Sequence, residues 1–410
     1  LVYVQNVLKQ NVFRTSGQSE VIVGEDGWLF YSRALDDFLG TSAADETEIE
    51  RMGAVALMMQ NYVESRGGEF IFFPAPNKMS VYGEYMPYYY IEDGGQGNYE
   101  RLYSELVNAG VNTVQLKNTL SLKKADGVQL YHKLDSHWNN YGAAVAYETV
   151  ADKLSEVYGD EFKGYTRYST MPYSVKNNLS GDLQSMLLPG SDRKDEQLEF
   201  DVSENFEYTN RFRGVDDLVI TTSNESKAVD KSVTLFRDSF GNALYWFFAN
   251  DYTSLTAKRE IPYNIYQAAE ESELVAVELV ERNLRNLLVY TPIVPSLNLG
   301  DDYFSGAVED TADSDCTAEA SVSVMTTTDG LLQVDGSCDA LSDYAYIYLV
   351  VEGGGTFQVL PSEEGADFTL YLESDDADIF NVDFAGKVCS FVVKDETGYV
   401  RIPVNVTLQD

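Results

Sequence analysis

The feature that most constrains this chain is a short, almost entirely apolar run, Glu69 to Pro74, that directly follows a helical pattern. From Glu46 to Arg66 apolar residues recur at helical spacing, and Gly67-Gly68 marks the end of that helix. A run that is apolar on both faces is typical of a strand inside a parallel sheet, because helices cover both sides of such a sheet. The pattern therefore predicts an α/β fold.

The same alternation continues to about residue 290 and predicts right-handed βαβ crossovers. Further helices are expected at Asn98 to Ala109, Tyr141 to Tyr158, about Phe240 to Ala249 and after Glu281. Further strands are expected at Val111 to Leu116, Val128 to Tyr131, Ser232 to Phe236, Tyr252 to Thr256 and Glu273 to Val280. Residues 160–230 are rich in Tyr, Asn, Ser and Asp with weak periodicity, which predicts an irregular or partly β insertion.

Charge and pattern separate the last quarter of the chain from the rest. Residues 301–410 hold 23 acidic and 3 basic residues, against 43 and 26 in the first 300. Seven short apolar runs separated by turns predict an immunoglobulin-like β-sandwich. These runs are Ala320 to Val324, Leu331 to Val334, Tyr344 to Val351, Thr356 to Leu360, Phe368 to Leu372, Val388 to Val393 and Val400 to Val406. We expect an α/β domain at 1–299, a linker at 300–315 and the β-sandwich at 316–410.

Several classes of function are excluded by composition. The net charge of −37 repels nucleic acid, so neither DNA nor RNA is an expected partner. No stretch of 18 apolar residues is present to span a membrane, and no signal-peptide pattern is found. The glycine-rich segments Gly94 to Gly97 and Gly353 to Gly355 lack phosphate-binding spacing and context, so no nucleotide cofactor is expected.

The start of the chain and its cysteines favour an exported protein. Because the chain begins at Leu1, we expect a trimmed product in which Leu1 to Val12 once followed an export signal or membrane anchor. Cys316 and Cys338 lie almost symmetrically about a predicted turn, within reach of a disulfide, whereas Cys389 is expected to be a buried thiol. Three reduced thiols are the alternative.

The two histidines of the chain, His132 and His137, fall in one polar loop between a strand and a helix, together with Asp135 and Trp138. Histidine is the usual general base near neutral pH, and the carboxyl ends of strands are where α/β sheets bind ligands. One alternative is that both are surface loop histidines. Another is a metal site made by His132, Asp135 and His137, for which no further ligand is evident.

Ser239 follows an apolar strand and begins a helix, where backbone N–H groups suit stabilisation of an oxyanion. A serine in that position is otherwise an ordinary N-cap. Asn77 also follows a buried strand, so its amide is a candidate donor to the same oxyanion, or a turn residue. The Asp-His pair elsewhere in the chain offers a base to activate Ser239.

Four segments together resemble the DHHW proteins, which in turn look like the SGNH-hydrolase-like proteins of alginate O-acetylation. They are Gly24 to Tyr31, Pro76-Asn77-Lys78 with Val81-Tyr82, Asp135 to Trp138 with Gly142-Ala143, and Arg237 to Asn242. The resemblance covers roughly residues 20–290. Ser136 stands where the name-giving motif has histidine, and the serine segment follows the Asp-His segment, the reverse of ordinary SGNH esterases.

The resemblance implies a flavodoxin-like, three-layer α/β domain with a Ser-His-Asp triad. Neither a cofactor nor a metal is expected. In the triad Ser239 would be the nucleophile, His137 the base and Asp135 its orienter. The Ser239 N–H and neighbouring amides would bind the oxyanion. The remaining motif residues that are candidates for binding the oxyanion or substrate are Asn77, Lys78, Trp138, Arg237, Gly241 and Asn242.

The sequence thus predicts an exported enzyme that moves or removes an acyl group, expected to be acetyl, on a cell-surface or extracellular polysaccharide, through an acyl-Ser239 intermediate. Related systems pair such a domain with a membrane-bound acyl exporter, so a partner of that kind is implied. The rival hypothesis is a non-catalytic surface protein that binds carbohydrate or serves as a scaffold. A large distance between Ser239 and His137 would favour the rival.

Overall fold

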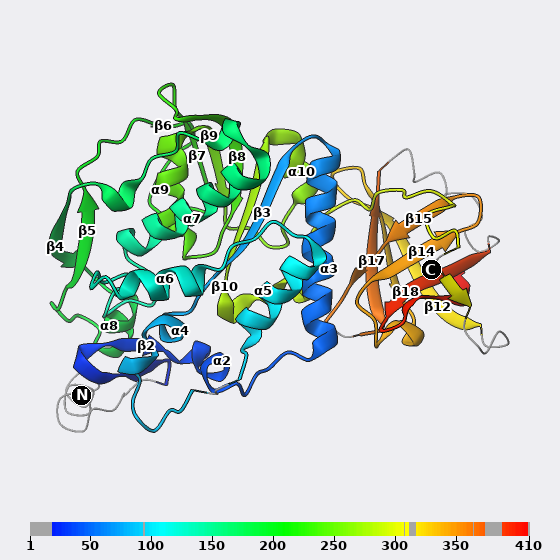
Figure 1. The fold of residues 1–410 in the computed structure, drawn as a ribbon, viewed down its shortest axis with the longest axis horizontal. Helices are drawn as coiled ribbons and strands as arrows, with labels where there is room; N and C mark the ends of the chain where they lie inside the picture. Colours follow the sequence, from blue (N-terminus) through cyan, green and yellow to red (C-terminus); the bar gives the residue numbers. More distant parts are fainter. Residues whose placement is uncertain are drawn as a thin grey trace.

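The structure is a computed structural model that describes residues 19–92, 95–306, 308–310, 317–363, 365–373 and 388–408. It has two parts: a sheet flanked by helices, and an all-β part beyond the long helix α3 (Figure 1). Within the described ranges, none of the helices combines the length and apolarity needed to cross a lipid bilayer.

A six-stranded mixed sheet forms the centre of the first part. Its strands, in spatial order, are β3 (Glu69–Ala75), β10 (Leu274–Val280), β8 (Val229–Phe236), β9 (Tyr252–Lys258), β7 (Val219–Ser223) and β6 (Glu207–Tyr208). The first four run parallel, whereas β7 and β6 join in antiparallel pairs. The strands predicted around residues 69, 232, 252 and 273 are therefore confirmed.

Helices cover both faces of this sheet. One face carries α6 (Leu116–Lys124), α7 (Asn140–Tyr158) and α9 (Gly241–Asp251), and the other carries α3 (Glu46–Ser65), α5 (Asn98–Ala109), α10 (Ile265–Glu271) and α11 (Asn286–Val289). Along β3, Ile71 and Phe73 belong to the first core and Phe70 and Phe72 to the second. Because both faces are covered, the strand is apolar at almost every position.

Local capping residues set the ends of the long helices. Asp45 and Glu48 form a capping box at the start of α3, with each side chain accepting the other's backbone N–H at 2.8 Å. Asn139 caps α7 by accepting the N–H of Gly142 at 2.9 Å. α5 ends at Gly110, whose φ of 83° is left-handed. These three helices begin and end within one residue of their predicted bounds.

Short elements complete the first part. Two hairpins pair β1 (Val21–Val23) with β2 (Leu29–Tyr31) and β4 (Tyr173–Leu179) with β5 (Asp195–Phe200). The short α-helices are α2 (Leu35–Leu39), α4 (Lys78–Tyr82) and α8 (Asp182–Leu187), and single 3-10 turns occupy Glu25–Gly27, Ser32–Ala34, Gly83–Tyr85, Asp160–Phe162, Tyr168–Thr170 and Glu281–Asn283. The predicted insertion at 160–230 is thus partly β, and it adds β6 and β7 to the main sheet.

The strand predicted from Val111 to Leu116 is not formed. Residues 111–115 have no regular structure and Leu116 begins α6. The segment lies beside edge strand β3, where the Phe72 N–H donates to the Asn112 oxygen at 3.0 Å. The N–H of Asn112, however, donates to the side chain of Gln60 on α3 at 2.7 Å. Because a side chain takes this donor, no ladder forms.

The second part is all-β, as predicted. In the order of their hydrogen-bonded path its strands are β15 (Gly355–Gln358), β14 (Ile347–Val351), β18 (Cys389–Asp395), β19 (Gly398–Leu408), β12 (Ala318–Thr326), β13 (Leu332–Ser337), β17 (Asp367–Leu372) and β16 (Leu360–Pro361), with a 3-10 turn at Asp339–Leu341. Phe368 of β17 packs against Phe391 of β18 with ring centroids 5.4 Å apart, so the path folds back around one core. An immunoglobulin-like arrangement stays a prediction.

The predicted linker at 300–315 contains structure where it is described. β11 (Val308–Asp310) pairs with β19, and the N–H of Leu299 already donates to the oxygen of Thr356 at 2.9 Å. The chain therefore joins the β part before residue 316. Cys338 and Cys389 are buried. The predicted Cys316–Cys338 disulfide lies outside the described residues, because Cys316 is not among them.

Helix α3 joins the two parts, and we call its contact with the β part the seam. Met52 and Val55 belong to the core under the sheet, whereas Ala54 packs with Tyr346 of the β part. Arg51 is only 2% exposed, and its guanidinium donates at 2.6–3.3 Å to five backbone oxygens of the β part. These oxygens belong to Leu341, Ser342, Tyr344, Ser362 and Gly365.

Candidate active site

Three loops meet at the carboxyl edge of the parallel strands. β8 leads into Arg237 to Ser239, β3 into Pro76 to Lys78, and β10 into Glu281. Their carboxyl ends lie next to one another because β3 and β8 both pair in parallel with β10. This edge is where open α/β sheets bind ligands.

Ser239, His137 and Asp135 form a continuous hydrogen-bonded relay at this edge. His137 Nε2 lies 2.8 Å from Ser239 Oγ, and His137 Nδ1 lies 2.7 Å from Asp135 Oδ1. Asp135 Oδ1 also accepts the backbone N–H of His137 at 3.0 Å. A proton held on Nδ1 by the carboxylate leaves Nε2 free to accept the serine proton. The arrangement can activate a serine as a nucleophile.

Lys78 supports the loop that carries the Asp-His pair. Its side chain is buried, and Nζ donates to the backbone oxygens of His132 at 3.0 Å, Lys133 at 3.3 Å and Asp135 at 2.5 Å. Burial lowers the pKa of Lys78 to about 8. The ammonium group of this predicted substrate-binding candidate therefore faces backbone oxygens rather than the groove.

Asp182, which the sequence did not single out, extends the network. Its Oδ2 accepts from Ser136 Oγ at 2.5 Å, and its N–H donates to Asp135 Oδ2 at 2.9 Å. Ser136, which replaces the histidine of the DHHW motif, thus has a partner of its own. At Gly181 a Cβ would lie 2.1 Å from the oxygen of Leu134, so glycine is what lets α8 approach this loop.

The two neighbouring carboxylates differ in electrostatics. Burial raises the pKa of Asp182, and the charge of Asp135 raises it further. Burial also acts to raise the pKa of Asp135, but its hydrogen bond to His137 and the nearby charge outweigh that effect and hold the pKa well below its usual range. Asp135 is therefore ionised at neutral pH. This keeps a charged acceptor beside Nδ1.

His132 lies outside the relay. It is buried, burial lowers its pKa, and its Nδ1 lies 2.9 Å from the backbone oxygen of Glu196. Of the two histidines, only His137 contacts Ser239.

The serine turn is fixed by its neighbours. Asp238 Oδ1 accepts the N–H of Phe240 at 2.8 Å, and Oδ2 accepts a backbone N–H at the end of β10 at 2.9 Å. Trp138 Nε1 donates to the oxygen of Phe240 at 2.9 Å, and the His137 ring meets the Phe240 ring edge to face at 5.0 Å. Trp138 thus ties the turn of Ser239 to the residue next to the base.

Arg237 braces the other wall of the site. It is 2% exposed, and its guanidinium donates to the backbone oxygens of residues 215 and 217 at 3.0 and 2.9 Å and to the side-chain oxygen of Asn242. At Gly241 a Cβ would lie 2.4 Å from Arg237 Cβ, which explains the glycine. Of these three candidates, Asn242 is the one that lines the groove.

One backbone donor stands ready beside the nucleophile. The N–H groups of Asp238 and Phe240 are taken by Glu278 and Asp238, at 3.1 and 2.8 Å. Among the described residues, no acceptor is found for the N–H of Ser239. An oxyanion that develops next to Ser239 can therefore receive that hydrogen bond.

Asn77 is placed away from the groove. Its side chain is 1% exposed, donates to Asp37 at 3.4 Å and accepts from Arg282 at 3.1 Å. Its N–H donates to Glu281, whose pKa burial raises to about 7. In this structure Asn77 fastens the turn after β3 and does not point to the oxyanion.

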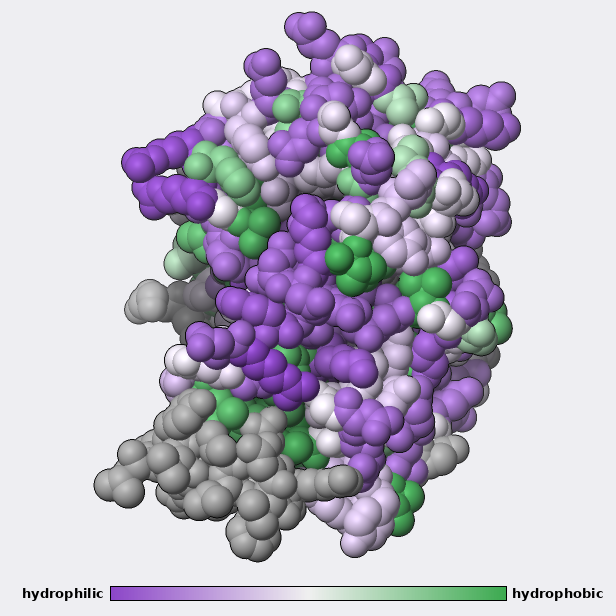
Figure 2. All heavy atoms as spheres, turned by 90° about the vertical axis from the view of Figure 1, so that its left-hand side faces the viewer, coloured by the Kyte–Doolittle hydropathy of each residue, from purple (hydrophilic) through white to green (hydrophobic). Residues whose placement is uncertain are grey.

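The relay opens into a groove of about 620 Å³. The residues that line it are His132, Asp135, His137, Trp138, Asn140, Leu179, Ser180, Asp182, Gln197, Val215, Asp216, Ser239, Phe240, Asn242 and Ala243. Most are polar, and the side of the molecule that bears β4 and β5 is predominantly hydrophilic (Figure 2). The chemistry that this arrangement supports is acyl transfer through a serine.

A metal is a weaker interpretation of the same residues. Asp135, His137 and Asp182 offer ligand atoms within 4.8 Å of one another. Asp182 Oδ1 accepts the backbone N–H of Ser136 at 2.8 Å, and the other carboxylate oxygens and both ring nitrogens take part in the hydrogen bonds described above. A bound cation would have to break the His137–Asp135 contact, so the arrangement favours serine activation.

The family described as "SGNH hydrolase-like domain, acetyltransferase AlgX" matches residues 21–251, more than half of the chain. A curated relative, the probable alginate O-acetylase AlgJ of Pseudomonas putida, is 28% identical over 183 residues, 43% of this chain and 46% of that protein. AlgJ of Pseudomonas aeruginosa is 25% identical over 142 residues, 34% of this chain and 33% of that protein. The chain thus spans less than half the length of the curated relatives it matches.

One solved structure, PatB1, shares the fold of the first part. PatB1 of Bacillus cereus aligns over 64% of this chain and 96% of its own, with 15% identity and a TM-score of 0.50. A DHHW family protein from Eubacterium siraeum aligns over 57% of this chain and 85% of its own, with 14% identity and a TM-score of 0.43.

Proposed function

The chain belongs to the family of SGNH hydrolase-like domains represented by the acetyltransferase AlgX, and from that membership we propose that it transfers an acetyl group to, or removes one from, a polysaccharide. The names of its curated relatives, probable alginate O-acetylases, support a polysaccharide as substrate. The observation that carries the proposal is the relay from Ser239 through His137 to Asp135, with distances of 2.8 and 2.7 Å.

In the first step Ser239 Oγ attacks the carbonyl carbon of an acetyl donor while His137 Nε2 takes the serine proton. The negative charge moves to the carbonyl oxygen, where the N–H of Ser239 can donate to it. The intermediate collapses as His137 returns the proton to the leaving group. The products are acetyl-Ser239 and the protonated leaving group.

In the second step a hydroxyl group attacks the acetyl-serine and His137 takes its proton. The intermediate collapses as the ester bond to Ser239 Oγ breaks and His137 returns the proton to that oxygen. If that hydroxyl belongs to a sugar, the acetyl group is transferred to the sugar. If it belongs to water, the acetyl-serine is hydrolysed and acetate is released. The family's name and the polar lining of the groove favour the sugar. Asp135 remains ionised throughout and stabilises the imidazolium that forms in each step.

The proposal includes the setting in which the reaction takes place. An exported protein acting on a cell-surface or extracellular polysaccharide, with a membrane-bound partner that supplies acyl groups, agrees with the kind of substrate in the relatives' names. The rival hypothesis, a non-catalytic carbohydrate-binding or scaffold protein, is disfavoured by the 2.8 Å contact of two residues that are far apart in the sequence.

The test is intact-mass spectrometry after incubation with p-nitrophenyl acetate. The wild-type protein should gain one acetyl group, located on Ser239 by peptide analysis. Ser239→Ala should gain none, and its rate of p-nitrophenol release should fall by roughly 10³ to 10⁶-fold. Ser180→Ala, which changes another serine of the groove, is the matched control and should behave as wild type.

Acetylation that persists in Ser239→Ala would overturn the assignment of the nucleophile. Absence of any adduct on the wild type, under conditions where a known serine esterase is labelled, would favour the binding-protein hypothesis instead.

A further inference from the structure

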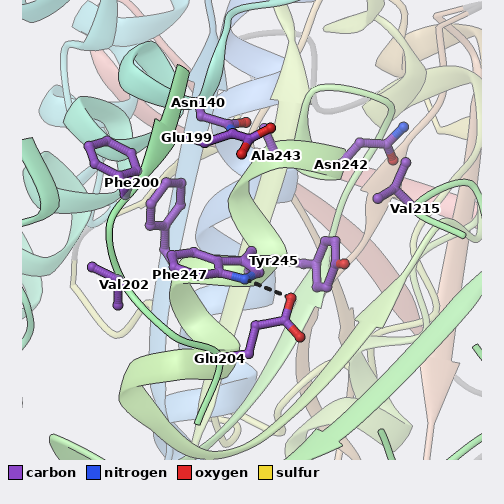
Figure 3. A pocket seen from close by; sticks show the side chains of 11 residues that line it. Asn140, Glu199, Phe200, Val202, Glu204, Val215, Asn242, Ala243, Tyr245 and Phe247 are labelled. Carbon is purple, nitrogen blue, oxygen red and sulfur yellow. Dashed lines mark hydrogen bonds between the residues drawn. The ribbon is translucent and has the colours of Figure 1, made fainter. Parts of the chain in front are cut away.

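Beyond the nucleophile the groove continues into a second cavity of about 360 Å³ (Figure 3). The two cavities share Asn140, Val215, Asn242 and Ala243 as lining residues. Helix α9 forms a common wall, since it begins two residues after Ser239 and contributes residues 242, 243 and 245–247. A ligand bound in this cavity therefore lies next to the acylated serine.

Aromatic side chains form the floor of this cavity. They come from two elements: Tyr245, Trp246 and Phe247 from α9 and Phe200 from the end of β5. Trp246 is only partly buried, and on its inner side it meets Phe247 edge to face with ring centroids 5.3 Å apart. It also meets Tyr168 edge to face with ring centroids 5.6 Å apart, so neighbouring rings hold the indole in place before any ligand arrives.

A carboxylate fixes the orientation of the indole. Trp246 Nε1 donates to Glu204 Oε1 at 3.1 Å, the contact drawn as a dashed line in Figure 3. Within the described hydrogen bonds the second oxygen of Glu204 has no donor, so it can accept from a ligand hydroxyl. Asn140 and Asn242 add amide groups on the side toward Ser239. An aromatic face ringed by such acceptors and donors suits a pyranose ring.

The charges that line both cavities are of one sign. Together they include five carboxylates, Asp135, Asp182, Glu199, Glu204 and Asp216, and no lysine or arginine. Lys176 and Arg259 pair with Glu199 and Asp216, but among the described residues neither of these cations lines the cavities. The lining offers no basic side chain to pair with a sugar carboxylate. Its own carboxylates and the chain's net charge of −37 repel such a carboxylate.

We propose that the aromatic cavity is the acceptor subsite and that it takes a sugar unit without a carboxylate, such as a hexose or an N-acetylhexosamine. The ring stacks on Trp246 and a hydroxyl bonds Glu204, which presents the neighbouring hydroxyl to acetyl-Ser239. The inference rests on the proposed function, and it separates this chain from relatives whose names specify alginate, a polyuronate.

Binding is measured first in Ser239→Ala, which cannot turn over. The chain has three tryptophans, of which Trp28 and Trp138 are 2% and 1% exposed, so fluorescence quenching by acrylamide reports mainly on Trp246. Oligomers of glucose and of N-acetylglucosamine should protect the indole, whereas oligomannuronate of equal length should not. Stronger protection by oligomannuronate, or none by either neutral oligomer at millimolar concentration, overturns the proposal.

Turnover is measured second, by following loss of acetyl-Ser239 in the otherwise wild-type protein. Neutral oligosaccharide should speed this loss, and Trp246→Ala should reduce that acceleration at least about tenfold. The rate at which p-nitrophenyl acetate forms the adduct should stay within twofold of wild type. Tyr88→Ala, at a tyrosine that is 89% exposed and away from the groove, is the matched control.

Protection of Trp246 tests the acceptor subsite, and the formation of acetyl-Ser239 tests the proposed function, so the two can fail independently. Failure of acetyl-Ser239 to form would end the proposed function, but oligosaccharide protection of Trp246 would still stand. Normal acylation with an unchanged sugar acceleration in Trp246→Ala would end the subsite and leave the proposed function intact.

Discussion

At the carboxyl edge of the sheet and at the seam, a buried basic side chain donates hydrogen bonds to backbone oxygens, but the two side chains serve different purposes. At the edge, the Lys78 ammonium donates to three backbone oxygens of the loop that carries Asp135 and His137. At the seam, the Arg51 guanidinium donates to five backbone oxygens of the β part. In both, a buried cation donates to the backbone oxygens of turns that lie outside the regular strands.

The difference lies in what each cation holds and in its chemistry. Lys78 supports the loop that carries Asp135 and His137, the pair that accepts the serine proton. The pKa of Lys78 itself, about 8, lies close to physiological pH. Arg51 supports turns that pack against an apolar helix, and a guanidinium keeps its proton at any such pH. The support that Lys78 gives to the loop at the edge can therefore change with pH, whereas the support that Arg51 gives to the seam does not change over the physiological range.

The strongest test of this contrast is Asp135→Asn. The amide cannot hold His137 in the required tautomer, so the rate of acetyl-enzyme formation should fall by roughly 10³ to 10⁴-fold. The free energy of unfolding should also fall, because the native protein holds the pKa of this carboxyl well below its usual range, so the rate is measured at a temperature where the variant is folded. Asp182→Asn is the control: it removes a carboxylate that contacts Ser136 and lies 3.9 Å from His137 Nδ1, and the rate should fall less than about tenfold. Equal losses in the two variants would contradict the assigned roles.

The second test moves to the seam with Arg51→Met. Loss of the guanidinium leaves several buried carbonyl oxygens without a donor, so the free energy of unfolding should fall by about 3 to 5 kcal/mol in urea denaturation. The acetylation rate of the folded protein should match wild type. Arg66→Met removes a more exposed ion pair of the same seam, with Glu373, and should cost less than about 1 kcal/mol. A large loss of the acetylation rate in Arg51→Met would contradict the difference that we infer between the edge and the seam.

The smallest expected effect is on the alkaline side of the pH–rate profile. As Lys78 loses its proton above about pH 8, the loop loses its charged donor, and the acetylation rate should fall by about tenfold by pH 9.5. Lys78→Met should be slower at neutral pH and lack this alkaline limb. A wild-type profile that is flat to pH 10 would rule the effect out.

Global unfolding does not account for that limb. Between about pH 8 and the usual value of 10.5 the unfolded chain binds more protons at Lys78 than the native protein does. The contribution of this residue to the free energy of unfolding therefore rises with pH, by up to about 3 kcal/mol. Urea denaturation at pH 7 and pH 9.5, compared between wild type and Lys78→Met, separates the two effects.

Local patterns predicted much of the fold. The apolar runs of β3 and β10 and the bounds of α3, α5 and α7 depend on periodicity and on capping residues that are adjacent in sequence. The strand expected at 111–116 failed because a side chain from α3, Gln60, takes the N–H of Asn112. Such a contact between distant segments leaves no mark in local periodicity.

The site shows the same division. Ser239 and the Asp-x-His pair could be recognised from their places after strands and from the family resemblance. Asp182 and Trp246 could not, because what brings them to the site is the tertiary packing of α8 and α9. Lys78 was found as a motif residue, but its burial, and so its supporting role, needed the structure.

Helix α3 is buried both toward the sheet and toward the β part, with Met52 and Val55 on one side and Ala54 on the other. A helix that two cores share cannot lose one of them without exposing an apolar face. The β part and the α/β part should therefore form one cooperative folding unit, and both should unfold in a single transition. Proteolysis or truncation near residue 300 would accordingly yield an aggregating fragment in place of an independent catalytic core.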